Sequence, residues 1–346
     1  MNGRARPLVR AEQLASVDRD QTRWRHRYNA GAAPLSPVIR ASMSSLAQVR
    51  ARRASRECRP DAWLQLTGWY RPRPQGRVVR ASFHDGNLAT FLQRPDLRLD
   101  RTTRSVKRAL AHERRLYDEM DVILTMSEWL RRSFLDDFEQ DPEKVVAVGA
   151  GPNFDAPPDV PERRWTPLRA LFVGKDWERK GGPAVLRAFA RVREQQPGAE
   201  LAIIGPERLP GPIPEGVNFH GRLMPGAPEL RAAFASATAF LMPSVYEPFG
   251  IALLEAMAYG LPCIAGDACA MPEIVEEGET GFLVAPGDTE ALADRLGALA
   301  AQPRLAEDMG RAARRRMDAR FTWRAVAERA VEAIATNQLR ASMASS

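Results

Sequence analysis

The sequence predicts an α/β protein with two doubly wound, parallel-sheet domains that face a cleft. Its 346 residues are too many for one small core and suit two domains. In residues 168–322, short apolar runs alternate regularly with helix-forming segments, which is typical of parallel strands joined by right-handed crossover helices. Glycines and charged residues cluster where predicted strands end, the edge at which open α/β sheets bind ligands.

The first half of the chain carries a less regular pattern of the same kind. We assign residues 61–155 to the first domain and residues 156–167, rich in proline and arginine, to a linker. Ser127 precedes a helix-forming segment and is a residue type that caps helices. The predicted strands cover residues 61–70, 77–83, 121–127 and 144–148, and the predicted helices cover residues 103–120 and 128–138.

The second half alternates strand and helix throughout. Pro183 favours the start of a helix, and Gly260 followed by Pro262 favours the end of one. The predicted strands cover residues 169–173, 200–204, 217–219, 237–242, 263–265 and 281–284. The predicted helices cover residues 228–237, 250–259, 304–320 and 323–337, with others beginning near Pro183, Asp267 and Thr289.

Two glutamates follow the predicted strand at residues 237–242. Glu247 lies in the strand-to-helix loop, whereas Glu255 lies in mid-helix among apolar residues, where a carboxylate is costly without donors. One interpretation is a pair of carboxylates facing one polyhydroxylated ligand. The alternative is a buried ion pair at Glu255 and a helix-entry Glu247 that the helix dipole favours. The spacing alone leaves both interpretations open.

The segment at residues 174–182 has the composition of an anion site. It combines Lys175 and Lys180 with glycines that admit close approach and with the start of a predicted helix. The glycines do not have the spacing of a Walker loop. A solvated charged loop is the alternative.

A polar cluster, residues 83–87, follows the predicted strand at 77–83. His84 is one of only four histidines, and its place at the carboxyl end of a strand favours a binding site over a structural role. Asp85 follows it directly.

Composition narrows the class of protein. Hydrophobic residues make up 45% and charged residues 27% of the chain, as in soluble globular proteins, and no apolar run reaches the length of a membrane span. The start of the sequence has no apolar segment behind its basic residues, which argues against a secretory signal. Cys58, Cys263 and Cys269 form neither a disulfide framework nor a metal pattern. A cytoplasmic location follows as an expectation.

The basic charge is concentrated in residues 1–60. This segment holds thirteen arginines and four acids, a net charge of +9, and because the whole chain carries +7 the remainder is at −2. Anionic lipid, nucleic acid or a phosphorylated acceptor could meet such a surface, although the few aromatic residues weaken the nucleic-acid interpretation. A solvated basic surface is the alternative. Asp18 and Asp20 form a D-x-D that is not predicted to hold a metal, because no strand flanks it.

The run EPFGIALLEAMAYGLPCIA, beginning at Glu247, resembles the signature of the retaining family-4 glycosyltransferases (glycosyl transferases group 1), which have the GT-B fold. The resemblance implies that Glu247 contacts the donor sugar and that Glu255 holds the ribose of the nucleotide. It implies a donor-binding role for Phe249, Gly250 and Ile251 as well.

Weaker matches extend the resemblance to about Phe83. Lys175 and Lys180 fall where the family binds the donor diphosphate. His84 falls where the family has a histidine that faces the donor sugar, and Asp85 is a further candidate for sugar contact. The resemblance thus implies Glu247, His84 and Lys180 as catalytic residues, with no metal, and a last helix, residues 323–338, that crosses back to the first domain.

The implied function is transfer of a hexose, with retention, from a UDP- or GDP-sugar to a glycan or lipid-linked acceptor, in envelope, exopolysaccharide or glycolipid synthesis. No cofactor or nucleic acid is expected. The Arg-rich segment would place the enzyme at the inner face of an anionic membrane.

Three departures from the family pattern favour a catalytically silent scaffold as the alternative. They are Lys175 in place of arginine, Cys269 and Ala270 in place of paired glycines, and a first domain that is short or atypical, since residues 1–60 show no first strand with a Gly-rich loop. A further hypothesis, compatible with catalysis, is a basic adaptor that binds anionic surfaces through residues 1–60.

Overall fold

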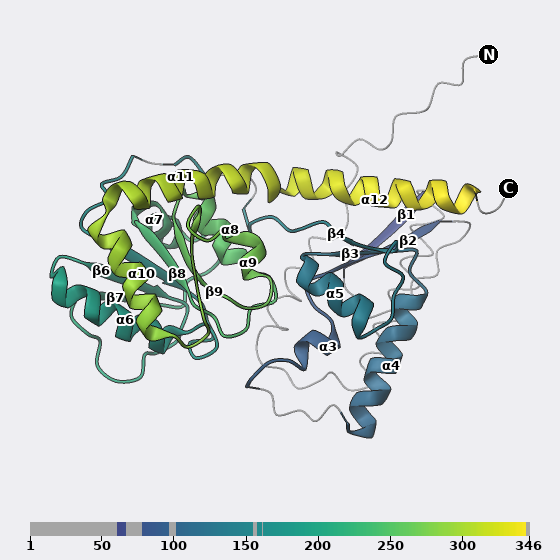
Figure 1. The fold of residues 1–346 in the computed structure, drawn as a ribbon, viewed down its shortest axis with the longest axis horizontal. Helices are drawn as coiled ribbons and strands as arrows, with labels where there is room; N and C mark the ends of the chain where they lie inside the picture. Colours follow the sequence, from purple (N-terminus) through teal and green to yellow (C-terminus); the bar gives the residue numbers. More distant parts are fainter. Residues whose placement is uncertain (1–60, 67–77, 97–101, 155–157, 161, 344–346) are drawn as a thin grey trace, which may run out of the picture.

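The computed structural model describes residues 61–66, 78–96, 102–154, 158–160 and 162–343. The predicted basic segment at residues 1–60, with Asp18 and Asp20, lies outside the described residues. Two parallel sheets, each with its own helices, form a first and a second domain (Figure 1). Among the described residues, no helix combines the length and the apolar character that a membrane span requires.

The first domain is built on a four-stranded sheet of order β1-β2-β3-β4, with all pairs parallel. Helix α3 was not predicted, and it follows its N-cap residue Asn87, whose side chain forms a capping box with Thr90. Ser127 caps α5 as predicted, accepting from the Leu130 N–H. The elements are β1 (Ala62–Leu66), β2 (Val79–His84), α3 (Leu88–Phe91), α4 (Arg104–Asp118), β3 (Val122–Thr125), α5 (Glu128–Asp136) and β4 (Val145–Ala147).

Alternation along the strands of the first sheet sends side chains to two different cores. Ile123 and Val145 pack with residues of α4 and α5 such as Tyr117 and Phe134. The neighbouring positions face the last helix of the chain instead: Ala81, Val122, Leu124 and Val148 pack with Val326 and Ala330. The central strands β2 and β3 are therefore covered on both faces, as is typical of parallel sheets.

The second domain is built on a six-stranded parallel sheet of order β10-β9-β8-β5-β6-β7. From β5 the chain moves outward on one side through β6 and β7, then returns to build β8, β9 and β10 on the other. The order therefore reverses between β5 and β8, and the crevice beyond their carboxyl ends is the favoured ligand position of such a sheet. The strands are β5 (Arg169–Val173), β6 (Glu200–Ile204), β7 (Val217–Gly221), β8 (Ala239–Met242), β9 (Cys263–Gly266) and β10 (Gly281–Val284).

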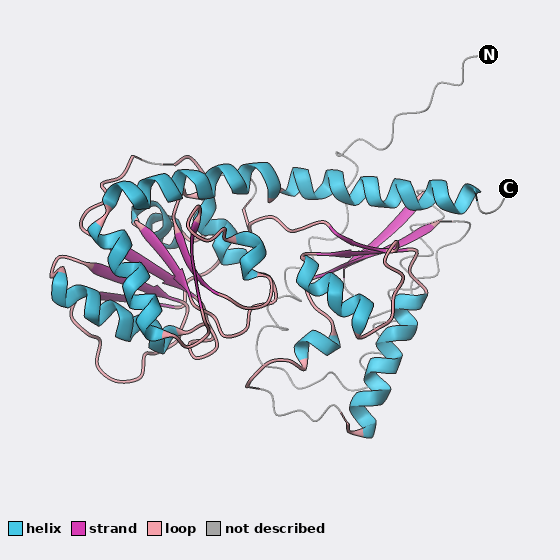
Figure 2. Cartoon of the chain, viewed as in Figure 1, coloured by secondary structure: helices cyan, strands magenta, loops and turns pink. Residues whose placement is uncertain are grey.

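Helices lie on both faces of this second sheet (Figure 2). Helices α6 and α10 share one core with Phe172 and Leu201, and helices α7 and α8 share the other with Leu171 and Phe240. The helices are α6 (Gly182–Gln195), α7 (Pro228–Ser236), α8 (Ile251–Ala258), α9 (Met271–Ile274), α10 (Thr289–Ala301) and α11 (Pro303–Arg320).

Helix α12 (Trp323–Met343) leaves the second domain and runs along the first (Figure 1). The Trp323 indole N–H donates to the Pro152 carbonyl at 2.8 Å. Arg329 donates to the Val148 carbonyl at 2.9 Å, and the Asn337 amide donates to the Asp121 carbonyl at 2.9 Å.

A second connection between the domains is the carboxylate of Glu273, which lies in α9. It accepts from the backbone N–H groups of Glu128 and Trp129 at 2.8 and 2.7 Å. An anion is favoured there because the first N–H groups of a helix have no partner within the helix. The carboxylate of one domain thus caps α5 of the other.

Candidate functional site

Two loops of the second domain meet at the crevice, residues 174–181 after β5 and residues 243–250 after β8. Gly181 permits this approach: its φ is +77°, and a Cβ there would lie 2.3 Å from the Pro243 carbonyl oxygen. A Cβ on Gly174 would lie 2.2 Å from Cδ of Lys180. Gly181 therefore lets the backbones of the two loops approach each other, and Gly174 leaves room for the Lys180 side chain.

Lys180 and Glu247 form an ion pair where the two loops meet. The Lys180 ammonium lies 2.7 Å from Oε2 of Glu247, and the two side chains are only 15% and 16% exposed. Burial by itself would raise the pKa of Glu247, but the charges of Lys180 and Arg179 outweigh it and hold the pKa below its usual value. Glu247 is therefore ionised at neutral pH.

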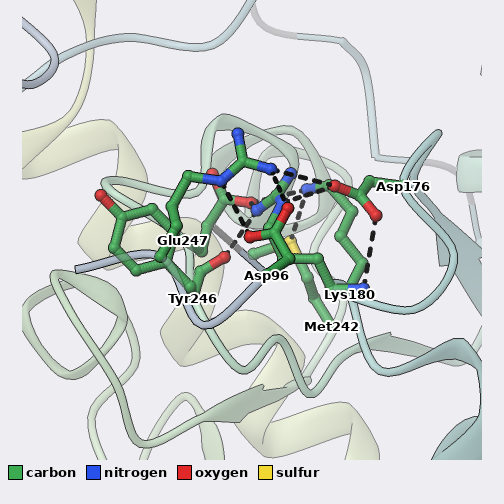
Figure 3. A network of polar contacts seen from close by, with 8 residues as sticks. Asp96, Asp176, Lys180, Met242, Tyr246 and Glu247 are labelled. Atoms are coloured by element: carbon green, nitrogen blue, oxygen red, sulfur yellow. Dashed lines mark hydrogen bonds and ion pairs between the residues drawn. The ribbon is translucent and has the colours of Figure 1, made fainter. Parts of the chain in front are cut away.

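Arg179 and Asp176 extend this ion pair into a network (Figure 3). Nε of Arg179 donates to Oδ2 of Asp176 at 2.8 Å, and its Nη1 lies 2.5 Å from the Tyr246 carbonyl and 3.4 Å from Glu247. Neither residue was among the predicted site residues. Their spacing, i and i+3 within the loop, was the signal that could have found this pair.

The first domain contributes to the same network through the segment that follows α3. Nη2 of Arg94 lies 2.5 Å from Asp96 and 3.8 Å from Oδ2 of Asp176. The Tyr246 hydroxyl donates to the Thr90 carbonyl at 2.7 Å. The loop that holds Glu247 is thus fastened to α3 of the first domain, which local sequence patterns could not have shown.

Glu255 lies on α8, half-buried, at the interface with the first domain. Burial raises its pKa, although hydrogen bonds from the side chain and backbone of Asn153 and the charge of Lys180 act in the opposite direction. Asn153 belongs to the turn that precedes the linker. The partners of Glu255 are therefore an amide and a more distant ammonium, which differs from the buried ion pair considered as an alternative.

The residues between the two glutamates form the entry to α8. Gly250 has a φ of +101° as the residue preceding the helix, a conformation that favours glycine. Phe249 is buried against the Phe321 ring, so its contact is with the core, and Ile251 is half-buried. Gly250 accordingly supplies the turn that separates Glu247 from the helix.

Three predicted site residues lie away from the network. Lys175 is exposed, on the same loop as Lys180. Asp85 is exposed just after β2. His84 is 1% exposed, with its ring edge-on to Tyr117 at 5.3 Å and to Phe134 at 5.0 Å.

The position of His84 departs from the expectation that it faces the donor sugar. Side chains of a strand alternate, and the last residue of β2 points to the face that α4 and α5 cover. Burial lowers the pKa of His84 to about 3, and its Nε2 has no hydrogen-bond partner among the described residues. The imidazole is a neutral core group in this conformation.

Cys269 follows β9 and lies beside Glu247. Its φ is +53°, unusual for a residue with a side chain, and the Glu247 backbone hydrogen-bonds its thiol. This is the turn where the family resemblance implied paired glycines, and a thiol occupies it here. Within the described residues, no group of three or more His, Cys, Asp and Glu could hold a metal ion.

The second domain is similar to one family of known proteins. The model of the family described as glycosyl transferases group 1 matches residues 167–302. Glycogen synthase of Mycobacterium tuberculosis is 30% identical over 222 residues, which cover 61% of this chain and 53% of that protein. Alpha-maltose-1-phosphate synthase of Mycolicibacterium smegmatis is 30% identical over 251 residues, covering 64% of each. The chain thus spans between half and two thirds of the length of these relatives.

A solved structure extends the similarity to both domains. Sucrose-phosphate synthase of Thermosynechococcus elongatus superimposes with a TM-score of 0.64 at 20% sequence identity, covering 91% of this chain and 81% of that one. The fold is therefore GT-B, which confirms the fold class expected from the sequence.

Proposed function

We propose, from the premise that residues 167–302 belong to the group 1 glycosyl transferases, that the protein transfers a sugar from a nucleotide diphosphate donor to an acceptor. The relatives that it matches include a glycogen synthase and a maltose-1-phosphate synthase, which supports sugar transfer over other uses of the fold. Fold alone would not, because one fold hosts many functions.

The observation that carries the proposal is the buried Lys180–Glu247 pair at the carboxyl ends of β5 and β8. A departing nucleotide diphosphate develops negative charge, and preorganised cations stabilise that charge best in a partly dry site. Lys180 and Arg179 supply them, and Glu247 holds both in place. In this assignment the Glu247 carboxylate also accepts from a sugar hydroxyl, and Glu255 accepts from the ribose.

The finer features of the function follow the family resemblance. We propose a UDP- or GDP-sugar donor, retention of anomeric configuration, and a glycan or lipid-linked acceptor, without a metal. Phe249, Gly250 and Ile251 would shape the donor side of the site, and Lys175 would reach the diphosphate from solvent. His84 would act indirectly, by packing beneath the carboxyl end of β2, since its ring is buried. We also propose that the protein lies peripherally at an anionic membrane.

Nucleotide binding and donor hydrolysis test the proposal together. UDP, GDP and ADP at about 100 times their dissociation constant should stabilise the protein by ~2.7 kcal/mol, visible as a rise in Tm. UDP-glucose and GDP-mannose are then followed for slow release of nucleotide by wild type and by Glu247→Gln.

The outcomes distinguish a catalytic protein from a catalytically silent scaffold. Release that wild type performs and Glu247→Gln does not supports catalysis. Binding without release supports the catalytically silent scaffold. If no nucleotide raises the Tm, the donor site itself is refuted.

A further inference from the structure

One carboxylate oxygen joins the two domains at the edge of the site. Oδ2 of Asp176 lies 2.8 Å from Nε of Arg179 and 3.8 Å from Nη2 of Arg94. Asp176 and Arg179 belong to the loop after β5, whereas Arg94 belongs to the first domain. A single acidic oxygen therefore lies between guanidinium groups that the two domains present to each other.

Guanidinium groups bind carboxylates and phosphates through the same fork of N–H donors. A position between two of them suits a phosphate oxygen as well as it suits Oδ2 of Asp176. Arg94 is held ready for this by Asp96, whose two oxygens accept from its Nε and Nη2. The hydrogen bond from Arg94, and after it the charge of Arg94, lower the pKa of Asp96 against the opposing effect of burial, so this carboxylate stays ionised at neutral pH.

The network is electrically balanced without a ligand. Three cations, Arg94, Arg179 and Lys180, face three acids, Asp96, Asp176 and Glu247. A nucleotide diphosphate would add negative charge to a balanced cluster. Binding becomes more favourable if one of the acids gives up its cations.

Asp176 is the acid whose withdrawal would free a guanidinium of each domain. Its side chain is 40% exposed, whereas Glu247 is 16% exposed and held by Lys180 and Arg179. Asp96 is 48% exposed, but both of its oxygens accept from Arg94. An exposed ion pair contributes little stability, and water replaces the lost partners of a carboxylate that turns outward. The Arg94–Asp176 contact at 3.8 Å is the longest ion pair of the network.

We propose that Asp176 is an internal competitor for the donor diphosphate, and that Arg94 of the first domain binds the diphosphate when Asp176 withdraws. The inference rests on the proposed function, because it concerns the same site. It makes the donor site a two-domain site, completed by the segment after α3. Asp176 would keep Arg94 and Arg179 in place until the donor arrives.

Two substitutions have opposite expected effects. Asp176→Asn keeps the shape but removes the competing charge, and we expect it to bind UDP or GDP about two- to fivefold more tightly. Arg94→Gln removes a charge-assisted donor, and we expect it to bind about tenfold or more weakly. Because the gain in Asp176→Asn acts partly through Arg94, it should shrink in the double variant.

The measurement is calorimetric titration of the full chain with UDP and with GDP, at low and at high salt. Arg114→Gln is the matched control, because it removes an arginine from an exposed pair with Glu139 in the first domain. It should leave affinity unchanged. Circular dichroism melts verify that each variant is folded, and Arg94→Lys, which keeps the charge and loses the fork, should bind with intermediate affinity.

Failure of this inference and failure of the proposed function give different results. If wild type binds nucleotide and Lys180→Met weakens binding, but Arg94→Gln matches the control, then the role of Arg94 is refuted and the donor site stands. Weaker binding by Asp176→Asn would refute the competitor role, because it would make Asp176 a ligand contact. If wild type binds neither nucleotide, both proposals are refuted.

Discussion

Replacing Lys180 by methionine tests whether the buried ion pair sets the ionisation of Glu247. Methionine preserves most of the aliphatic stem that lies over Gly174 and removes only the ammonium group. Glu247 then keeps Arg179 at 3.4 Å as its remaining charged partner. Burial, which now opposes ionisation with less compensation, should raise the pKa of Glu247 above its usual value.

The sign of the pH dependence should therefore invert. In the wild type the pKa of Glu247 is lowered on folding, so its contribution to stability is present at neutral pH and is lost as the pH falls through the folded pKa. In Lys180→Met the folded protein binds more protons than the unfolded chain. The destabilisation is then largest at neutral pH and is relieved as the pH falls toward the unfolded pKa.

The magnitude follows from the exposure of the pair. Stranding a fully buried charge costs about 3–5 kcal/mol, but Glu247 is 16% exposed and retains Arg179. Loss of a charged hydrogen bond, about 1.5–3 kcal/mol, is the better estimate. For a domain of this size, each kcal/mol lowers the Tm by about 2–4 °C, so we expect a decrease of roughly 3–12 °C at pH 7.5.

Thermal melts at pH 7.5 and pH 5.5 measure both the size and the sign. Lys175→Met is the control, because it removes the same charge from an exposed position of the same loop. It should change the Tm by no more than about 1 °C. A Lys180→Met variant as stable as this control, or one whose deficit grows at pH 5.5, would refute our account of the pair.

Three further substitutions test other contacts. Glu255→Gln should weaken nucleotide binding by about 1–3 kcal/mol. It should not lower the Tm at pH 7, because burial raises the pKa of Glu255 and its charged form is held at a cost. Nucleotide titration and thermal melts measure the two effects, and a lower Tm with unchanged affinity would assign Glu255 a structural role. Gly151→Ala should cost about 1–3 kcal/mol in urea unfolding, because its Cβ would lie 2.7 Å from the Trp323 ring, and unchanged stability would contradict that packing. Glu273→Gln should speed hydrogen exchange at the start of α5 by weakening a cap worth about 0.5–2 kcal/mol, and an unaltered exchange rate there would speak against the interdomain cap.

Local patterns in the sequence were sufficient for the second domain. Strands β5, β6 and β10 begin and end at the predicted residues, because each holds a largely buried apolar run that follows a charged residue or a glycine. Helix α3 was missed because its four residues show no period and depend on the capping box of Asn87. Such a short element is decided by side-chain hydrogen bonds more than by propensity.

The site was predictable where its residues follow strands of one parallel sheet. Lys180 and Glu247 each follow a strand of the second sheet, and the topology of parallel strands brings such positions together. Arg94 pairs with Asp176 across the domains, and no local period signals such a contact. His84 was expected at the ligand because it ends a strand, but which face α4 and α5 cover depends on the packing of the whole domain.

The crossing of α12 has a consequence for how the protein folds during synthesis. Among the described residues, one face of the first sheet, with Ala81, Val122 and Leu124, packs against Val326, Ala330 and their neighbours in α12. Domains that emerge early from a ribosome ordinarily fold first. Here the earlier sheet would keep an uncovered apolar face until the second domain has been made. We therefore expect nascent chains that end before α12 to bind holdase chaperones through the first domain, and to release them once the last helix is available.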